Sequence, residues 1–168
     1  MSQMVLSILV DNTAGVLSRV SGLFSRRGYN IDSLSVGETE DPRFSRMTVA
    51  FSGDDSIKEQ IRKQLAKLED VVEIIELHPD NSVCRELVLV KVKVGQKDRQ
   101  DVASVVDIFR AKIVDVAPDS LMIELTGNQA KINAFLKLLE GYTIMEIVRT
   151  GITGLVRGAG DIADYISD

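Results

Sequence analysis

The hydrophobic pattern of this chain passes through the same order of elements twice. In the first half, apolar runs and strand-like alternation occur at 4–10, 30–36, 47–51 and 71–77, and helical spacing occurs at 16–24 and 57–68. Period-two alternation is typical of strands, whereas steps of three and four are typical of helices. The predicted order is strand, helix, strand, strand, helix, strand, which forms one antiparallel sheet with two helices.

The second half repeats this order with little sequence identity to the first. Strands are predicted at 87–94, 113–117, 121–125 and 142–148, and helical spacing occurs at 102–109 and 132–139. In 87–94, valines occupy one face and lysines the other. The sequence therefore predicts an α+β protein with two copies of one unit. We assign 1–78 to the first domain, 79–83 to a polar linker and 84–168 to the second domain.

The last part of the chain, 151–168, contains Gly151, Gly154, Gly158 and Gly160. A phosphate-binding loop would need the strand–loop–helix setting and a Lys-Ser/Thr pair, and this segment lacks both. We therefore expect a tail that is flexible or that docks on a partner.

Composition excludes several classes of function. Hydrophobic residues make up 45% of the 168 residues, and the net charge is −5, which argues against nucleic acid as a partner. The single cysteine, Cys84, excludes an intramolecular disulfide and fits a reducing cytoplasm. The sequence shows neither a signal-peptide pattern nor the run of about 20 apolar residues that a membrane helix requires. We expect a cytoplasmic protein that does not bind membranes.

Catalytic and metal-binding residues are scarce. His78 is the only histidine and lies beside Pro79 in the predicted linker, and Cys84 has no second histidine to activate it. No cysteine and histidine residues have the spacing of metal ligands. The predicted sheets also lack the exposed aromatic residues with which such folds bind RNA. We expect neither a catalytic residue nor a metal site in this chain.

The segment 11–17, Asp-Asn-Thr-Ala-Gly-Val-Leu, joins the first predicted strand to the first predicted helix. A strand that turns directly into a helix leaves the first backbone N–H groups of the helix unpaired, and these groups favour a carboxylate or phosphate. Gly15 would let such a ligand approach the main chain. A second interpretation is structural: Asn12 or Thr13 is an N-cap, and Gly15 is a turn residue.

Several segments resemble the small regulatory subunit of acetohydroxyacid synthase, also called acetolactate synthase. They are 10–17, 23–34, 41–42, 45–48, 85–87, 109–116 and 149–158, in collinear order over nearly the whole chain. The resemblance implies an N-terminal ACT domain followed by a second ferredoxin-like domain, each with the predicted order of elements. It also implies that the chain is not an enzyme, but activates a separate catalytic subunit and confers feedback inhibition by valine.

The family's effector site maps onto matching residues of this chain. The resemblance implies that valine binds to Asn12, Gly15, Val16 and Leu17 in the first turn and to Asn30 and Ile31 at the start of the next strand. It implies pairing of two ACT domains in a homodimer. Thiamine diphosphate, Mg²⁺ and FAD are expected on the catalytic subunit, and no cofactor is expected here. The corresponding turn of the second half, 95–100, has no glycine at the helix start, so we expect no second site.

Two alternatives to this function remain open. The chain could be a free-standing ACT-domain sensor of amino acids that controls another enzyme or a transcriptional partner. It could also be a small enzyme of an unrecognised kind. Co-purification with a large thiamine-dependent subunit distinguishes the first alternative from the regulatory subunit, and turnover by the isolated chain distinguishes the second.

Overall fold

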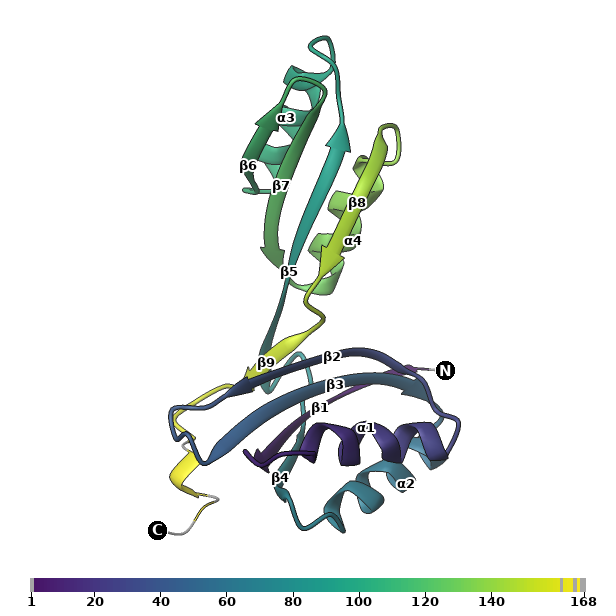
Figure 1. Cartoon of the computed structure of the whole chain (residues 1–168), viewed down its shortest axis with the longest axis vertical. Coiled ribbons are helices and arrows are strands. Elements are labelled where there is room, and N and C mark those ends of the chain that lie inside the picture. The colour runs from purple at the N-terminus through teal and green to yellow at the C-terminus, as the bar shows by residue number, and fades with distance from the viewer. Residues whose placement is uncertain (1, 161, 165, 167–168) are drawn as a thin grey trace. The chain divides into compact units, whose positions relative to one another are not determined.

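The computed structural model describes residues 2–160, 162–164 and 166 and divides into two compact units (Figure 1). Unit 1 contains the residues up to Cys84 together with those from Ile152 onward, and unit 2 is Arg85–Gly151. The two antiparallel sheets and four α-helices confirm the predicted α+β class. The division differs from the assigned domains at the tail, which is grouped with unit 1 and not with the second domain.

The N-terminal part of unit 1 contains six elements in the predicted order. They are β1 (Ser2–Asp11), α1 (Val16–Arg26), β2 (Ile31–Glu38), β3 (Phe44–Gly53), α2 (Asp55–Ala66) and β4 (Val71–Glu76). The sheet has the strand order β2-β3-β1-β4, with antiparallel neighbours. Both helices lie on one face of this sheet (Figure 1). β2 and β4 are therefore the edge strands.

The core of unit 1 lies between the sheet and its helices. Alternate residues of β1 point into this core, and they are Met4, Leu6, Ile8 and Val10. Phe24 of α1 and Phe51 of β3 contact each other edge to face with ring centroids 5.3 Å apart, a geometry that aromatic pairs favour. Gly28 follows α1 with φ of 70°, the left-handed conformation expected of a glycine after a helix.

Unit 2 is built from the second set of elements. They are β5 (Ser82–Lys93), α3 (Arg99–Ile108), β6 (Lys112–Ala117), β7 (Ser120–Gly127), α4 (Gln129–Leu138) and β8 (Thr143–Arg149). The strand order is β6-β7-β5-β8, which corresponds to the order in unit 1. Val88, Val90 and Val92 of β5 are fully buried against the helices. Asn128 caps α4, and its side chain accepts a hydrogen bond from the Lys131 N–H.

The tail forms structure on unit 1, in contrast to the flexible or partner-docked tail that we expected. β9 (Thr153–Val156) pairs with β5, and the Arg157 N–H donates to the Asn81 carbonyl at 2.8 Å. A Cβ at Gly154 would lie 2.9 Å from the Val83 carbonyl oxygen, so only glycine fits this close approach. A 3₁₀ helix (Ile162–Asp164) follows, labelled η1.

The tail covers the face of the unit 1 sheet that is turned away from the helices. Leu9 and Phe44 point to this face, and both pack against Ile162 of the tail. Ile152 is also buried, and its backbone bonds to Ser33 and Ser35 of β2. Isoleucines in the tail thus supply the apolar cover that the sheet needs on its second face.

The corresponding face of unit 2 contains a shallow groove of about 420 Å³. It is lined by Leu89, Lys91, Met122, Glu146, Ile147 and Val148. Lys91 Nζ and a Glu146 carboxylate oxygen form an ion pair at 2.7 Å on this face. Val148 is 60% exposed, so this face carries apolar side chains that the chain leaves in contact with solvent.

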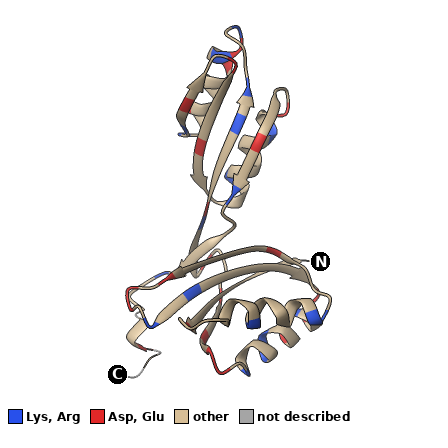
Figure 2. Ribbon diagram, viewed as in Figure 1, with Lys and Arg blue, Asp and Glu red and all other residues tan. Residues whose placement is uncertain are grey.

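Basic and acidic residues are interspersed along the elements of both units (Figure 2). No element carries a long run of one sign. Among the described residues, no helix has the length and hydropathy needed to span a bilayer.

Candidate functional site

The turn between β1 and α1 ends in an uncapped helix. Gly15 is the N-cap residue, with φ of 86° and ψ of −5°, and no side chain accepts a hydrogen bond from the first turn of α1. The structural interpretation in which Asn12 or Thr13 caps the helix is therefore wrong. Gly15 occupies this position because a positive φ is strained for other residues.

The uncapped start leaves backbone donors free. In the part of the chain that the structure describes, the N–H groups of Leu17 and Ser18 have no hydrogen-bond partner. The positive end of the helix dipole lies at the same place, and no acidic residue occupies the first turn of α1. These features favour an anion such as a carboxylate.

Asn12 is held in a fixed orientation beside this turn. Its backbone N–H donates to the Arg43 carbonyl at 2.7 Å, and its side-chain Nδ2 donates to the Pro42 carbonyl at 3.1 Å and to Glu38 Oε2 at 3.3 Å. Both amide hydrogens are thus used, while no described residue donates to Oδ1. Asn12 therefore offers an acceptor, which suits an ammonium group.

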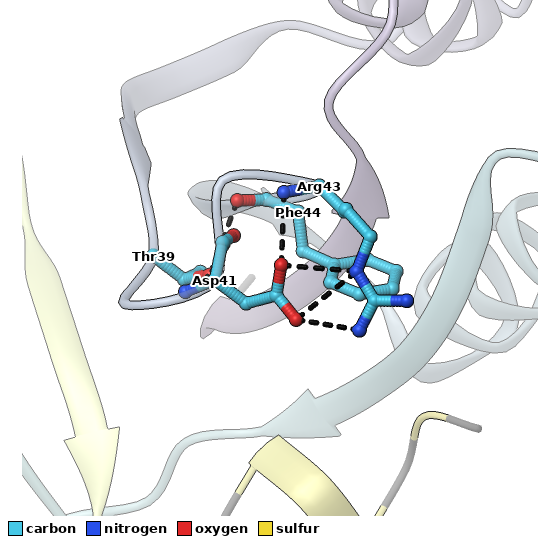
Figure 3. A network of polar contacts seen from close by, with 4 residues as sticks. All are labelled: Thr39, Asp41, Arg43 and Phe44. Carbon is cyan, nitrogen blue, oxygen red and sulfur yellow. Dashed lines mark hydrogen bonds and ion pairs between the residues drawn. The ribbon is translucent and has the colours of Figure 1, made fainter. Parts of the chain in front are cut away.

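The hairpin between β2 and β3 supplies these carbonyl groups and is itself tightly bonded (Figure 3). Arg43 Nη2 lies 2.7 Å from Asp41 Oδ2, and the Arg43 N–H donates to Asp41 Oδ1 at 3.0 Å. These bonds lower the pKa of the Asp41 carboxyl group, with the Arg43 side chain as the main cause. Thr39 Oγ1 contacts the Asp41 and Phe44 carbonyl oxygens at 2.8 and 3.1 Å, which closes the hairpin.

An ion pair joins α1 to the residue before β4. Arg19 Nε lies 2.5 Å from Asp70 Oδ2, and Thr13 Oγ1 donates to Asp70 Oδ1 at 3.5 Å. The bond to Arg19 is the main cause that lowers the pKa of Asp70, and the same bond raises the pKa of Arg19. The Asp70 side chain is 17% exposed, whereas that of Arg19 is 47% exposed.

Val16 and Leu17 differ in what they offer to a ligand. The Val16 side chain is 7% exposed and belongs to the core of unit 1, and its backbone N–H donates to the Thr13 carbonyl at 3.4 Å. The Leu17 side chain is 44% exposed and can contact a ligand directly.

The structure does not bring all six predicted residues together within one chain. Ile31 pairs with Phe51, which pairs with Met4, whereas Asn12 follows Asp11 at the other end of β1. Met4 and Asp11 are seven residue steps apart along β1, a span of about 23 Å. The first turn therefore lies at one end of the sheet, and Asn30 and Ile31 lie at the opposite end.

The sequence did not reveal which residues support the turn. Segment 41–42 contributes to the family resemblance, but nothing in its spacing shows that Pro42 and Glu38 bind Asn12. Arg19 and Asp70 gave no signal either, because they are 51 positions apart and each fits an ordinary solvent-exposed charge.

The other candidates for chemistry, His78 and Cys84, each lie near another polar side chain. His78 Nε2 lies 3.7 Å from Glu76 Oε2 at an exposed position, and Cys84 Sγ lies 3.9 Å from Ser82 Oγ. Across the described residues, no three His, Cys, Asp or Glu side chains are arranged to hold a metal ion.

Family models match both halves of the chain. Residues 6–73 match a model described as an acetohydroxyacid synthase small subunit-like ACT domain, and residues 85–158 match one described as the small subunit of acetolactate synthase.

Individual relatives give the same result. The chain is 52% identical over 153 residues to the acetolactate synthase small subunit of Mycolicibacterium smegmatis, covering 91% of this chain and 90% of that one. It is 48% identical over 156 residues to the probable acetolactate synthase small subunit of Methanothermobacter thermautotrophicus, covering 92% and 93%. The crystal structure of the Thermotoga maritima acetolactate synthase small subunit is similar with a TM-score of 0.85 and 42% identity, covering 95% of this chain and all of that one.

Proposed function

The chain belongs to the acetolactate synthase small-subunit family, and from this premise we propose that it regulates a separate catalytic subunit of that enzyme. In this proposal it activates the catalytic subunit and confers feedback inhibition by valine, within the synthesis of branched-chain amino acids. The thiamine diphosphate, Mg²⁺ and FAD expected for the reaction belong to the catalytic subunit, and the assembly acts in the cytoplasm.

The observation that carries the proposed effector site is the uncapped start of α1. An α-amino acid presents a carboxylate and an ammonium group a short distance apart. The free N–H groups of Leu17 and Ser18 suit the carboxylate, and the free Oδ1 of Asn12 suits the ammonium group. Leu17 is exposed beside them and can contact an aliphatic side chain.

A homodimer would complete this site. β2 is an edge strand of unit 1, and its outer backbone groups are open to pairing with another strand. Antiparallel pairing of β2 with β2 of a second copy would place the start of one strand beside the end of the other. Asn30 and Ile31 of the second copy would then approach Glu38 and the Asn12 turn of the first. Two equivalent sites follow from the two-fold axis.

The test combines the purified catalytic subunit with variants of the full chain. Gly15→Asp introduces a carboxylate into the anion site at a strained φ, and Asn12→Ala removes the acceptor. We expect both variants to stimulate acetolactate formation but to lose inhibition by valine. Gly95→Asp is the matched control, since a Cβ at Gly95 in the corresponding turn of unit 2 meets no atom within 4 Å.

Two results would contradict the proposal. If the wild-type chain neither binds nor stimulates the catalytic subunit, the regulatory role is wrong. If a folded Gly15→Asp variant keeps full sensitivity to valine, the effector lies elsewhere. Sedimentation of a dilution series tests the shared site: valine should shift the equilibrium toward dimer, because a ligand that binds only the dimer must stabilise it.

A further inference from the structure

The Arg19 guanidinium lies directly over the backbone of the first turn. A Cβ at Gly15 would lie only 2.9 Å from Arg19 Nη1. Arg19 Nη2 donates to the Ala14 carbonyl at 3.4 Å and to Asp70 Oδ1 at 3.1 Å. One side chain therefore bonds both to the turn and to the residue that precedes β4.

Asp70 completes a closed set of contacts around the same turn. Its backbone carbonyl accepts the Asp11 N–H at 2.8 Å, and its carboxylate accepts the Thr13 hydroxyl at 3.5 Å. The turn is thus bonded to the Arg19–Asp70 pair through Asp11 before it and through Thr13 and Ala14 within it. α1 has no capping side chain, and these bonds instead fix the backbone at the start of the helix.

We propose that Arg19 and Asp70 are positioning residues that hold the turn in the conformation that exposes the Leu17 and Ser18 N–H groups to the effector carboxylate. This inference rests on the proposed function and adds two residues to the six already assigned. Neither side chain needs to touch the effector. The pair acts by keeping the backbone donors fixed before the ligand arrives, so less freedom is lost on binding.

A different role for Arg19 gives the opposite prediction for one variant. If Arg19 attracted the effector carboxylate by its own positive charge, the negative charge of Asp70 would weaken that attraction. Asp70→Asn would then tighten binding. If the pair positions the turn, Asp70→Asn loosens the turn and weakens binding, as Arg19→Gln does. The two single variants therefore separate positioning from direct attraction.

The experiment is titration calorimetry of L-valine into the full-length protein. We expect Arg19→Gln and Asp70→Asn each to weaken binding about tenfold or more, since each removes hydrogen bonds to a charged partner. The double variant should resemble the single variants, because residues of one network are not additive. Arg19→Lys keeps the charge but loses the planar fork, and should recover binding only in part.

A matched control removes a charge outside this network. Lys63→Gln on α2 loses an exposed pair with Glu59, whose atoms lie 3.9 Å apart, and should leave valine affinity unchanged. The melting temperatures of all variants should stay close to that of the wild type, because the Arg19–Asp70 pair is not buried in the core.

The outcomes distinguish the inference from the proposed function. If the wild type binds valine and both single variants bind it equally well, the positioning role is wrong and the function stands. Tighter binding by Asp70→Asn also overturns positioning. If the wild type binds no valine, the effector assignment fails, and the positioning role is then tested by hydrogen exchange at the Asp11 and Val16 amides. Exchange at these amides should be faster in both single variants than in the wild type. Unchanged exchange would refute the positioning role.

Discussion

The two units of this chain share one order of strands but differ at the face of the sheet that the helices leave open. In unit 1, Ile162 and Ile152 of the tail cover this face. In unit 2, the corresponding face keeps an open groove with exposed Val148. The repeated pattern thus determines one buried face of each sheet, whereas a segment outside the repeat determines whether the second face is buried.

The turns at the helix starts differ in a related way. In unit 1, the turn at Gly15 leaves the Leu17 and Ser18 N–H groups without a partner among the described residues, and Arg19 pairs with Asp70. In unit 2, Asp98 is the N-cap without a capping bond, and Asp101 adds a second acidic group in the first turn of α3. The Arg99 guanidinium bonds to the Ala117 and Pro118 carbonyls of the neighbouring hairpin. The acidic residues would repel a carboxylate, so the same topology does not create the same site.

The largest effect is expected at an ion pair in unit 2. Arg149→Met leaves the Glu86 carboxylate, whose side chain is 4% exposed, buried without its partner. The loss of a partner from a buried pair costs about 3–5 kcal/mol. Lys91→Met breaks the exposed pair with Glu146 and should cost less than about 1 kcal/mol. Scanning calorimetry should show a lower transition temperature for unit 2; equal effects of the two changes would contradict this ranking.

An intermediate effect is expected when the tail loses its cover over unit 1. Ile162→Ala removes apolar contacts with Leu9 and Phe44 and should lower the stability of unit 1 by about 2 kcal/mol. Denaturant unfolding measures this change. Leu155→Ala is the control in the same tail, because Leu155 is 61% exposed. If both variants unfold alike, the tail does not stabilise this sheet.

The smallest effect is expected in the stability of unit 1 at acid pH. The pKa of Asp70 is lowered by Arg19 in the folded state, so the unfolded chain binds more protons as the pH falls. The pair therefore stabilises unit 1 above the unfolded pKa of about 4, and this contribution is lost as the pH falls through the lower folded pKa. Asp70→Asn should flatten the dependence of stability on pH below about 4. Urea unfolding at a series of pH values measures this dependence. If stability falls with acid equally in the variant and the wild type, Asp70 does not contribute to the loss of stability at low pH.

Local signals in the sequence predicted most elements of the fold. The apolar run from Met4 to Val10 predicts a strand, and the helical spacing at 16–24 predicts a helix; both depend only on neighbouring residues, and both elements are present as β1 and α1. The tail strand was not predicted, because Thr153–Val156 is short and glycine-containing and depends on a distant partner strand.

The candidate site could be predicted only in part for the same reason. The turn at Gly15 has a local signature, but its supports come from distant segments. Arg19 meets Asp70 because of the pairing between β1 and β4, which shifts register between Leu9 and Val10. Periodicity shows which face a residue occupies but not such a shift, so these partners could not be deduced from the sequence.

The grouping of the tail with unit 1 has a consequence for synthesis on the ribosome. Unit 1 is discontinuous in the chain, and all of unit 2 is made before Ile152 and Ile162 emerge. A nascent chain that has completed β4 therefore still exposes Leu9 and Phe44. Domains generally fold as units in the order of synthesis, and exposed apolar surface makes an incomplete unit prone to aggregate. Unit 2, which is continuous, can finish folding before the unit that begins the chain.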